Sequence, residues 1–355
     1  MKAYVLNRIG CLDLMDVPEP MLKDGEVLVE VKAAGICGSD IPRIFANGTY
    51  HFPTIPGHEF AGVVCKVKDK ENEGLIGKRV GVFPLIPCRT CAPCQKRQYE
   101  MCMHYDYLGS RSDGGFAEYV AVPVRNLIEI PDGISMEAAA MLEPASVGIH
   151  ALRRVYEEGM NSAVIFGPGT IGLLIAQWLR ALGVEEIILV GTGEGQKKLA
   201  GELGFSEFYN GKKVDVVQAI LERTAGEGVD LAIECAGYSE VLEECLDVVK
   251  RGGKVLTVGN PHGDLNLKRD AYWKILRKQL QLCGTWNSSF IPEEREDDWT
   301  RTIAAMEQGI LSPEKQITHR LPFEELHRGL EIMRDKSEYY NCLLYTSPSP
   351  RDPKT

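Results

Sequence analysis

The stretch SAVIFGPGTIGLL (residues 162–174) places an apolar strand, a glycine-rich turn and the start of a helix in immediate succession. Continuous apolar strands bounded by glycine are typical of parallel sheets that are buried on both faces. In a Gly-x-Gly-x-x-Gly turn of this kind, backbone N–H groups and the positive end of the helix can bind a pyrophosphate. The residues expected to bind a dinucleotide here are Gly167, Gly169, Thr170, Ile171 and Gly172.

The alternation of apolar strands and helices continues downstream of this turn. Further strands are expected at 186–190, 230–233 and 254–258, and helices at 170–182, 196–203, 214–223 and 239–249. This repetition predicts an α/β fold with a doubly wound parallel sheet, the Rossmann fold, over residues 151–285. Ligands bind at the carboxyl edge of such sheets, so Gly259, at the end of the last strand, is expected at the nucleotide site.

The end of the second of these strands leaves the choice of nucleotide open. About 20 residues beyond the glycines an acidic side chain normally binds the ribose hydroxyls of NAD, but here Gly191 and Thr192 follow the strand. Without a carboxylate at that point, Thr192, Lys197 or Lys198 could accept the 2′-phosphate of NADP. Glu194 could instead reach the ribose from the next turn. The expected coenzyme is therefore NAD(P)+, with Gly191 and Thr192 beside its ribose.

The first 150 residues follow a different pattern. Short alternating runs at 26–31, 60–67 and 79–83 are separated by glycine and proline, which indicates half-buried antiparallel strands. A helical pattern at 136–155 leads into the parallel sheet, and the pattern after that sheet is looser. We expect residues 1–150 to form a β-rich domain that residues 286–341 complete.

The C-terminal residues 342–355 do not look native. They contain Pro348, Pro350 and Pro353, and proline cannot donate to a strand ladder. The segment is therefore not expected to finish a sheet strand. Its composition is typical of translated adapter sequence, and the alternative is a disordered terminus.

Composition narrows the class of protein. The chain has 355 residues, enough for two domains, and its shares of 44% apolar and 25% charged residues are those of a globular protein. A net charge of −10 disfavours partners with a phosphate backbone and anionic membranes. The N-terminus lacks an apolar signal core, and the most apolar run contains glycine and proline, so we expect a cytoplasmic protein without a membrane span.

Four of the eleven cysteines fall in one short stretch. Two, two and seven residues separate them, and four thiolates at such spacing can close a tetrahedron around zinc. A closed shell leaves no open position, so this metal would be structural. The four expected ligands are Cys88, Cys91, Cys94 and Cys102.

A second set of possible metal ligands is dispersed over separate loops. Cys37, His58 and Glu143 combine a thiol, an imidazole and a carboxylate, which suits a catalytic zinc with one open position. Such a metal would lower the pKa of a substrate hydroxyl and so prepare it to give up a hydride. Ser39, two residues after Cys37, could carry the released proton outward.

Together these motifs resemble the zinc-containing medium-chain dehydrogenase/reductase family over nearly the whole chain. The resemblance rests on residues 35–40, 57–59 and 113–119, on Glu143-Pro144, and on the four cysteines and the glycine turn. It implies a GroES-like catalytic domain beside the Rossmann domain, and a homodimer or homotetramer. It also implies that Glu59 ligates the catalytic zinc or exchanges with water during turnover.

Within that family the resemblance is strongest to dehydrogenases of phosphorylated polyols. Glu143 stands where many alcohol dehydrogenases have cysteine, and the likeness extends over residues 37–45, 107–115 and 274–287. It implies oxidation of galactitol 1-phosphate to tagatose 6-phosphate with NAD(P)+. Because the protein is net negative, the substrate phosphate needs a local cation, and Arg43 or Arg111 could supply a bidentate guanidinium.

Three alternatives to this interpretation of the function are left open. The substrate could be unphosphorylated, as for sorbitol, butanediol or threonine dehydrogenases. A non-catalytic nucleotide-binding protein could have the same fold, although all three catalytic zinc ligands are present. A nucleic-acid-binding zinc module is disfavoured by the acidic composition and the absence of a basic, aromatic stripe.

Overall fold

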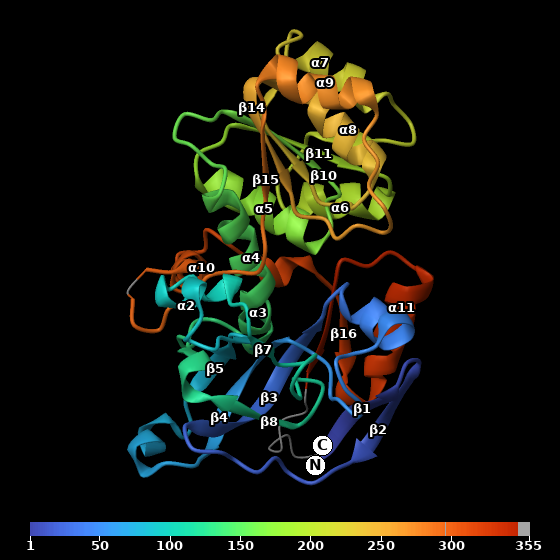
Figure 1. Ribbon diagram of the computed structural model, residues 1–355. Coiled ribbons are helices and arrows are strands. Elements are labelled where there is room, and N and C mark those ends of the chain that lie inside the picture. The colour runs from blue at the N-terminus through green and yellow to red at the C-terminus, as the bar shows by residue number, and fades with distance from the viewer. Residues whose placement is uncertain (295, 347–355) are drawn as a thin grey trace. The chain divides into compact units, whose positions relative to one another are not determined.

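A computed structural model of the protein describes residues 1–294 and 296–346, and the chain divides into two compact units (Figure 1). Unit 1 contains Met1–Glu143 and the chain from Ser289 onward, and unit 2 contains Pro144–Ser288. The sequence places the two boundaries at 150/151 and 285/286, a few residues from this division.

Unit 2 is built on a six-stranded sheet in which every neighbouring pair is parallel. Its order is β12-β11-β10-β13-β14-β15, so the chain starts in the middle and winds outward in both directions. This is the doubly wound sheet predicted from the apolar strands. The strands are β10 (Ser162–Phe166), β11 (Glu186–Gly191), β12 (Phe208–Asn210), β13 (Val229–Glu234), β14 (Val249–Thr257) and β15 (Gln281–Gly284).

Helices cover both faces of this sheet. Val164 and Phe166 of β10 join the core under α7, α8 and α9, whereas Ile165 between them points to the opposite face, where α5 packs. The helices of unit 2 are α4 (Leu142–Arg153, beginning in unit 1), α5 (Thr170–Ala181), α6 (Glu194–Glu202), α7 (Val216–Arg223), α8 (Ser239–Val248) and α9 (Arg269–Lys278).

The helix predicted over 136–155 is two helices. The first is α3 (Met136–Ala140), and α4 begins after Met141. Pro144 has no N–H to donate to the carbonyl of Ala140, so a continuous helix would lose that hydrogen bond. In the first turn of a new helix the missing N–H costs nothing.

Unit 1 is built on a seven-stranded, mostly antiparallel sheet of order β16-β17-β3-β4-β5-β9, with β8 paired to β3. Its strands are β3 (Glu26–Ile36), β4 (Glu59–Val67), β5 (Arg79–Val82), β8 (Tyr119–Pro123), β9 (Leu127–Glu129), β16 (Ile317–Pro322) and β17 (Cys342–Thr346). The unit also contains two two-stranded antiparallel sheets, the hairpin of β1 (Lys2–Arg8) with β2 (Cys11–Asp16) and the pair of β6 (Leu85–Ile86) with β7 (Asp106–Tyr107). The helices are α1 (Asp40–Pro42), a π-helix η1 (Arg43–Asn47), α2 (Ala92–Gln95), α3, α10 (Asp298–Glu307) and α11 (Leu326–Asp335).

The expectation that residues 342–355 stay out of the sheet is wrong for Cys342–Thr346. These residues form β17 between β16 and β3, with Leu343 opposite Ile36 and Tyr345 opposite Ala34. None of the three prolines of the segment falls within Cys342–Thr346, so the described strand keeps all its backbone N–H groups. The part of that prediction that concerns 347–355 lies outside the described residues.

Apolar side chains pack on both faces of the unit 1 sheet. One cluster joins β1, β3 and β4 to α11, and the other joins α3 and α10 to β17 through Leu344 and Cys342. Within the described residues, no helix combines the length and the apolar character that crossing a bilayer requires.

Candidate active site and metal centres

Three metal-binding side chains converge at one end of the β3–β4 pair. Cys37 follows β3, and His58 and Glu59 stand at the start of β4. The Cys37 sulfur, a His58 ring nitrogen and a Glu59 carboxylate oxygen all lie within 4.8 Å of one another. A Cβ on Gly35, opposite Glu59 in the ladder, would lie 2.4 Å from Glu59 Oε2, so a glycine is needed there to admit the carboxylate.

Glu143, the remaining predicted ligand, lies beside this group. It is buried in the first turn of α4. Among the described residues it is outside the set within 4.8 Å, but its charge acts on Glu59. Burial raises the pKa of Glu59 to about 8, the charge of His58 opposes that shift and the charge of Glu143 adds to it. Burial also raises the pKa of Glu143, against the charges of His58 and Arg43.

Asp40 is a site residue to which the sequence assigned no role. It is fully buried, its Oδ2 accepts the Cys37 N–H at 3.1 Å, and its Oδ1 lies 3.4 Å from His58 Nδ1. Burial would lower the pKa of His58, but the charges of Asp40 and Cys37 hold that pKa well above its usual range. The signal in the sequence was an acidic residue three positions after a candidate ligand.

These residues fit a zinc ion. Thiolate, imidazole and carboxylate are the ligands that zinc takes in proteins. Several buried acidic groups face one another here, and a cation between them would offset the cost of ionising them. Asp40 Oδ1 and His58 Nδ1 make no hydrogen bond within the described chain. A metal on the imidazole would fix which ring nitrogen keeps its proton, and that proton could then be donated to Asp40.

Ser39 lies at the same point of the fold. Its hydroxyl donates to the Cys37 sulfur at 3.3 Å. The structure therefore brings the predicted proton carrier into contact with a candidate ligand.

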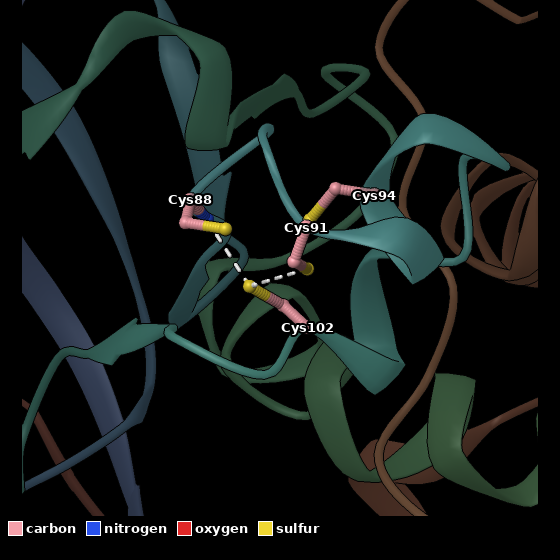
Figure 2. Close-up of side chains that lie close together, drawn as sticks. All are labelled: Cys88, Cys91, Cys94 and Cys102. Carbon is pink, nitrogen blue, oxygen red and sulfur yellow. Dashed lines mark hydrogen bonds between the residues drawn. The ribbon is translucent and has the colours of Figure 1, made fainter.

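The four cysteines of the second predicted centre also come together (Figure 2). Their sulfur atoms lie within 4.8 Å of one another, and the Cys102 sulfur accepts the Cys88 N–H at 3.2 Å. Hydrogen bonds from Thr90 are the main cause that lowers the pKa of Cys88 to about 5, and the Met103 N–H lowers the pKa of Cys91. The surroundings thus stabilise the thiolates of Cys88 and Cys91, the form that binds metal, whereas burial raises the pKa of Cys94 and of Cys102.

The lobe that carries these cysteines has little apolar core. Its buried cluster consists of Cys94, Tyr99, Cys102 and Ile291, so two of its four members are candidate ligands. A metal would therefore supply much of the cross-linking in this lobe. These residues fit a closed, structural zinc site.

The glycine turn of unit 2 has the geometry that a pyrophosphate site requires. Gly167 has φ +88°, and a Cβ on Gly172 would lie 2.5 Å from the Gly167 carbonyl oxygen. The turn leads directly into α5, which begins at Thr170. Gly259 follows β14, and a Cβ there would lie 2.5 Å from the Gly237 nitrogen. Both segments therefore pack glycine closely against neighbouring backbone at the carboxyl edge of the sheet.

The missing acidic residue after β11 has a steric explanation. A Cβ on Gly191 would lie 2.7 Å from Phe208, 2.8 Å from Gln196 Oε1 and 3.0 Å from Pro168. Gln196 Oε1 accepts the N–H groups of Thr192 and Gly193 at 3.0 and 3.1 Å. Neither Gln196 nor its contact with the turn was anticipated from the sequence.

Glu194, the acidic residue in the turn that follows, forms an ion pair. It pairs with Lys213 at 2.7 Å, and this hydrogen bond lowers the pKa of Glu194.

Comparison with known proteins agrees with this geometry. Residues 23–132 match the alcohol dehydrogenase GroES-like domain, and residues 170–308 match the zinc-binding dehydrogenase domain. Galactitol 1-phosphate 5-dehydrogenase of Escherichia coli K12 is 33% identical over 93% of this chain and 95% of its own. Sorbitol dehydrogenase of Bacillus subtilis is 34% identical over 97% of both chains.

Solved structures give the same result. A crystal structure of galactitol-1-phosphate dehydrogenase from Escherichia coli superimposes with a TM-score of 0.90 and 32% identity, over 98% of this chain and all of the other. A zinc-binding dehydrogenase from Sinorhizobium meliloti bound to NADP has a TM-score of 0.86 and 27% identity, over 97% and 98%. A non-catalytic role is therefore set aside. The chain belongs to the zinc-containing medium-chain dehydrogenase/reductase family, and it is a zinc-binding alcohol or polyol dehydrogenase with a nicotinamide coenzyme.

Proposed function

We propose that the protein oxidises a polyol phosphate, galactitol 1-phosphate to tagatose 6-phosphate, with NAD(P)+ as hydride acceptor. The observation that carries the catalytic part is the convergence of Cys37, His58 and Glu59 within 4.8 Å, with Glu143 acting on them. The likeness to galactitol 1-phosphate 5-dehydrogenase supports the substrate.

In this proposal Cys37, His58 and Glu143 would hold the catalytic zinc, and Glu59 would ligate it or exchange with water. Zinc bound there would lower the pKa of a substrate hydroxyl, and NAD(P)+ would accept the hydride. Asp40 orients the His58 ring from its buried position. Ser39 receives the hydroxyl proton and passes it outward, and its contact with the Cys37 sulfur holds it in place for that role.

The second zinc and the nucleotide occupy the other two sites. Cys88, Cys91, Cys94 and Cys102 hold a structural zinc. The nucleotide pyrophosphate binds Gly167, Gly169, Thr170, Ile171 and Gly172, with Gly191 and Thr192 beside the adenosine ribose and Gly259 at the same sheet edge. The substrate phosphate binds Arg43 or Arg111. We further propose a cytoplasmic homo-oligomer, a dimer or tetramer.

A second candidate is an unphosphorylated polyol or related alcohol. It is favoured by the similarity to sorbitol dehydrogenase, which is as high as that to galactitol 1-phosphate 5-dehydrogenase. In that case zinc bound to the same ligands would activate a hydroxyl group of sorbitol, butanediol or threonine.

A substrate panel tests the proposal. Zinc-loaded protein is assayed with galactitol 1-phosphate, galactitol, sorbitol, 2,3-butanediol and threonine, each with NAD+ and NADP+. The reverse reaction is assayed with tagatose 6-phosphate and NADH or NADPH. We expect the highest kcat/KM for galactitol 1-phosphate and its loss on prolonged chelation. A higher kcat/KM for any unphosphorylated substrate would favour the second candidate.

A further inference from the structure

Arg43 and Arg111 differ in the contacts that their guanidinium groups already make within the protein. Arg43 opens the π-helix η1, three residues after Asp40. Its Nη1 is buried and makes no hydrogen bond within the described chain, and its ion pair with Asp40 Oδ1 is long, at 3.6 Å. A buried guanidinium N–H without a hydrogen bond is costly, and an anionic ligand would accept one from it.

Arg43 borders the candidate zinc site through Asp40. Asp40 Oδ1 lies 3.6 Å from Arg43 Nη1 and 3.4 Å from His58 Nδ1, so the guanidinium is one residue removed from a candidate ligand. With 28% of its side chain exposed, the residue is accessible to solvent while acting on the site.

The guanidinium group of Arg111 already stacks on two aromatic rings. Its guanidinium carbon lies 3.9 Å over the Tyr50 ring and 4.5 Å over the Tyr105 ring, so aromatic rings cover the group. Its backbone N–H donates to the Tyr107 carbonyl at 2.9 Å, and its carbonyl contacts His51 Nε2 at 2.9 Å. Its Nε is also buried without a hydrogen-bond partner, but cation–π stacking already stabilises its charge.

We infer that Arg43 binds the phosphate group of the substrate and determines the preference for a phosphorylated polyol, whereas Arg111 joins the loops that carry Tyr50 and Tyr105. This inference rests on the proposed function. A substrate phosphate would approach a site that already contains Asp40, Glu59 and Glu143, all buried. Arg43 is a cation close enough to these carboxylates to offset that repulsion, and a guanidinium group can offer two parallel N–H donors to a phosphate.

The test compares two variants that remove the same charge, Arg43→Met and Arg111→Met, with Arg43→Lys as the conservative change. For each we measure zinc content, thermal midpoint, and kcat/KM with galactitol 1-phosphate and with galactitol. Calorimetry with tagatose 6-phosphate and with tagatose, on zinc-loaded protein without nucleotide, provides a readout that does not depend on turnover.

Arg43→Met should lower the ratio of kcat/KM for galactitol 1-phosphate over galactitol by about ten- to a hundredfold, the size expected for a charge-assisted hydrogen bond. Affinity for tagatose 6-phosphate should fall by a similar factor. Arg43→Lys should recover part of the ratio, because lysine keeps the charge but not the planar fork. Arg111→Met should leave the ratio unchanged within about twofold and lower the thermal midpoint.

Several outcomes would overturn the inference. If Arg43→Met changes both substrates by one factor, or if Arg111→Met alone abolishes the preference, Arg43 does not bind the phosphate, although the proposed function stands. If the wild-type protein itself shows no preference for the phosphorylated polyol, the proposed substrate and the inference fail together.

Discussion

Asp40 shows how one buried side chain can position a candidate metal ligand. Its carboxylate contacts His58 on one side and the backbone of Cys37 on the other. We expect Asp40→Asn to weaken zinc binding about 10- to 100-fold, the usual effect of losing a carboxylate behind a ligating histidine. Zinc per chain after dialysis against a graded series of chelator concentrations measures this affinity.

A matched control is Asp13→Asn, which makes the same chemical change on the exposed strand β2. It should release zinc at the same chelator concentration as the wild type. If Asp40→Asn also did so, the contact between Asp40 and His58 would have no role in holding the metal.

The raised pKa of Glu59 predicts how the zinc-free protein responds to pH. A carboxyl group with pKa about 8 in the folded state and about 4.5 unfolded binds more protons when folded, so stability falls as pH rises through that interval. His58, with its pKa also raised, acts in the same direction above pH 6.5. We expect the free energy of unfolding of zinc-free protein to fall between pH 5 and 8, with Glu59 contributing at most about 1.4 kcal/mol per pH unit.

Urea titrations of the zinc-free protein at several pH values measure that slope. Glu59→Gln should flatten it, because the amide does not titrate. An unchanged slope in this variant would show that Glu59 is not the group responsible.

At the scale of elements, sequence patterns revealed the strands that are buried on both faces. Residues 163–166 and 231–233 are continuously apolar, and both lie in the centre of the parallel sheet as β10 and β13. The edge strands β12 and β15 were not anticipated, because each has at most four residues and β15 is largely exposed. Short edge strands are held by their neighbours and carry little pattern of their own.

In the candidate site, too, the sequence revealed only the residues whose type or spacing is specific. Cys37, His58 and Glu143 could be recognised because zinc accepts few ligand types, and the four cysteines because their spacing is specific. Asp40 offered only a weak signal, an acidic residue three positions after Cys37, and the unsatisfied Nη1 of Arg43 offered none. Their contacts depend on a helical turn and a π-helix that bring them against other elements.

Strand β17 gives a prediction about folding. Tyr345 is fully buried, packs against Phe116 and Phe323 at 5.9 and 5.2 Å between ring centres, and donates a hydrogen bond to the Gly115 carbonyl. Truncating such a side chain costs about 3–5 kcal/mol. We therefore expect Tyr345→Ala to lower the free energy of unfolding by that amount in urea titrations.

Tyr272→Ala serves as the control, since 54% of Tyr272 is exposed. A substitution there should change stability by less than about 0.5 kcal/mol. Equal effects from the two substitutions would mean that β17 is not a central strand of the folded protein.

At the scale of the whole molecule, each unit has its own apolar core, whereas the cysteine lobe of unit 1 has very little. Only Tyr99 and Ile291 accompany the two cysteines in its buried cluster. A lobe of this kind depends on an added cross-link, because so small a core cannot offset the conformational entropy lost when its loops are ordered. The structural zinc is therefore expected to govern the stability of the lobe but not the chemistry of the site.

If the structural zinc stabilises the lobe without taking part in the reaction, substitutions of Cys94 and of Cys11 should give different results. Cys94→Ser should lower zinc from two ions to one per chain, because a structural site needs its full ligand set. It should also speed trypsin cleavage after Arg97, which is exposed in the lobe.

The control is Cys11→Ser, on the β1–β2 hairpin and distant in sequence from both sets of ligands, which should leave zinc content and cleavage unchanged. If Cys94→Ser kept two zinc ions and wild-type resistance to trypsin, the four cysteines would not be a metal site, whereas a fall to one ion with accelerated cleavage would show that the lobe folds around its metal.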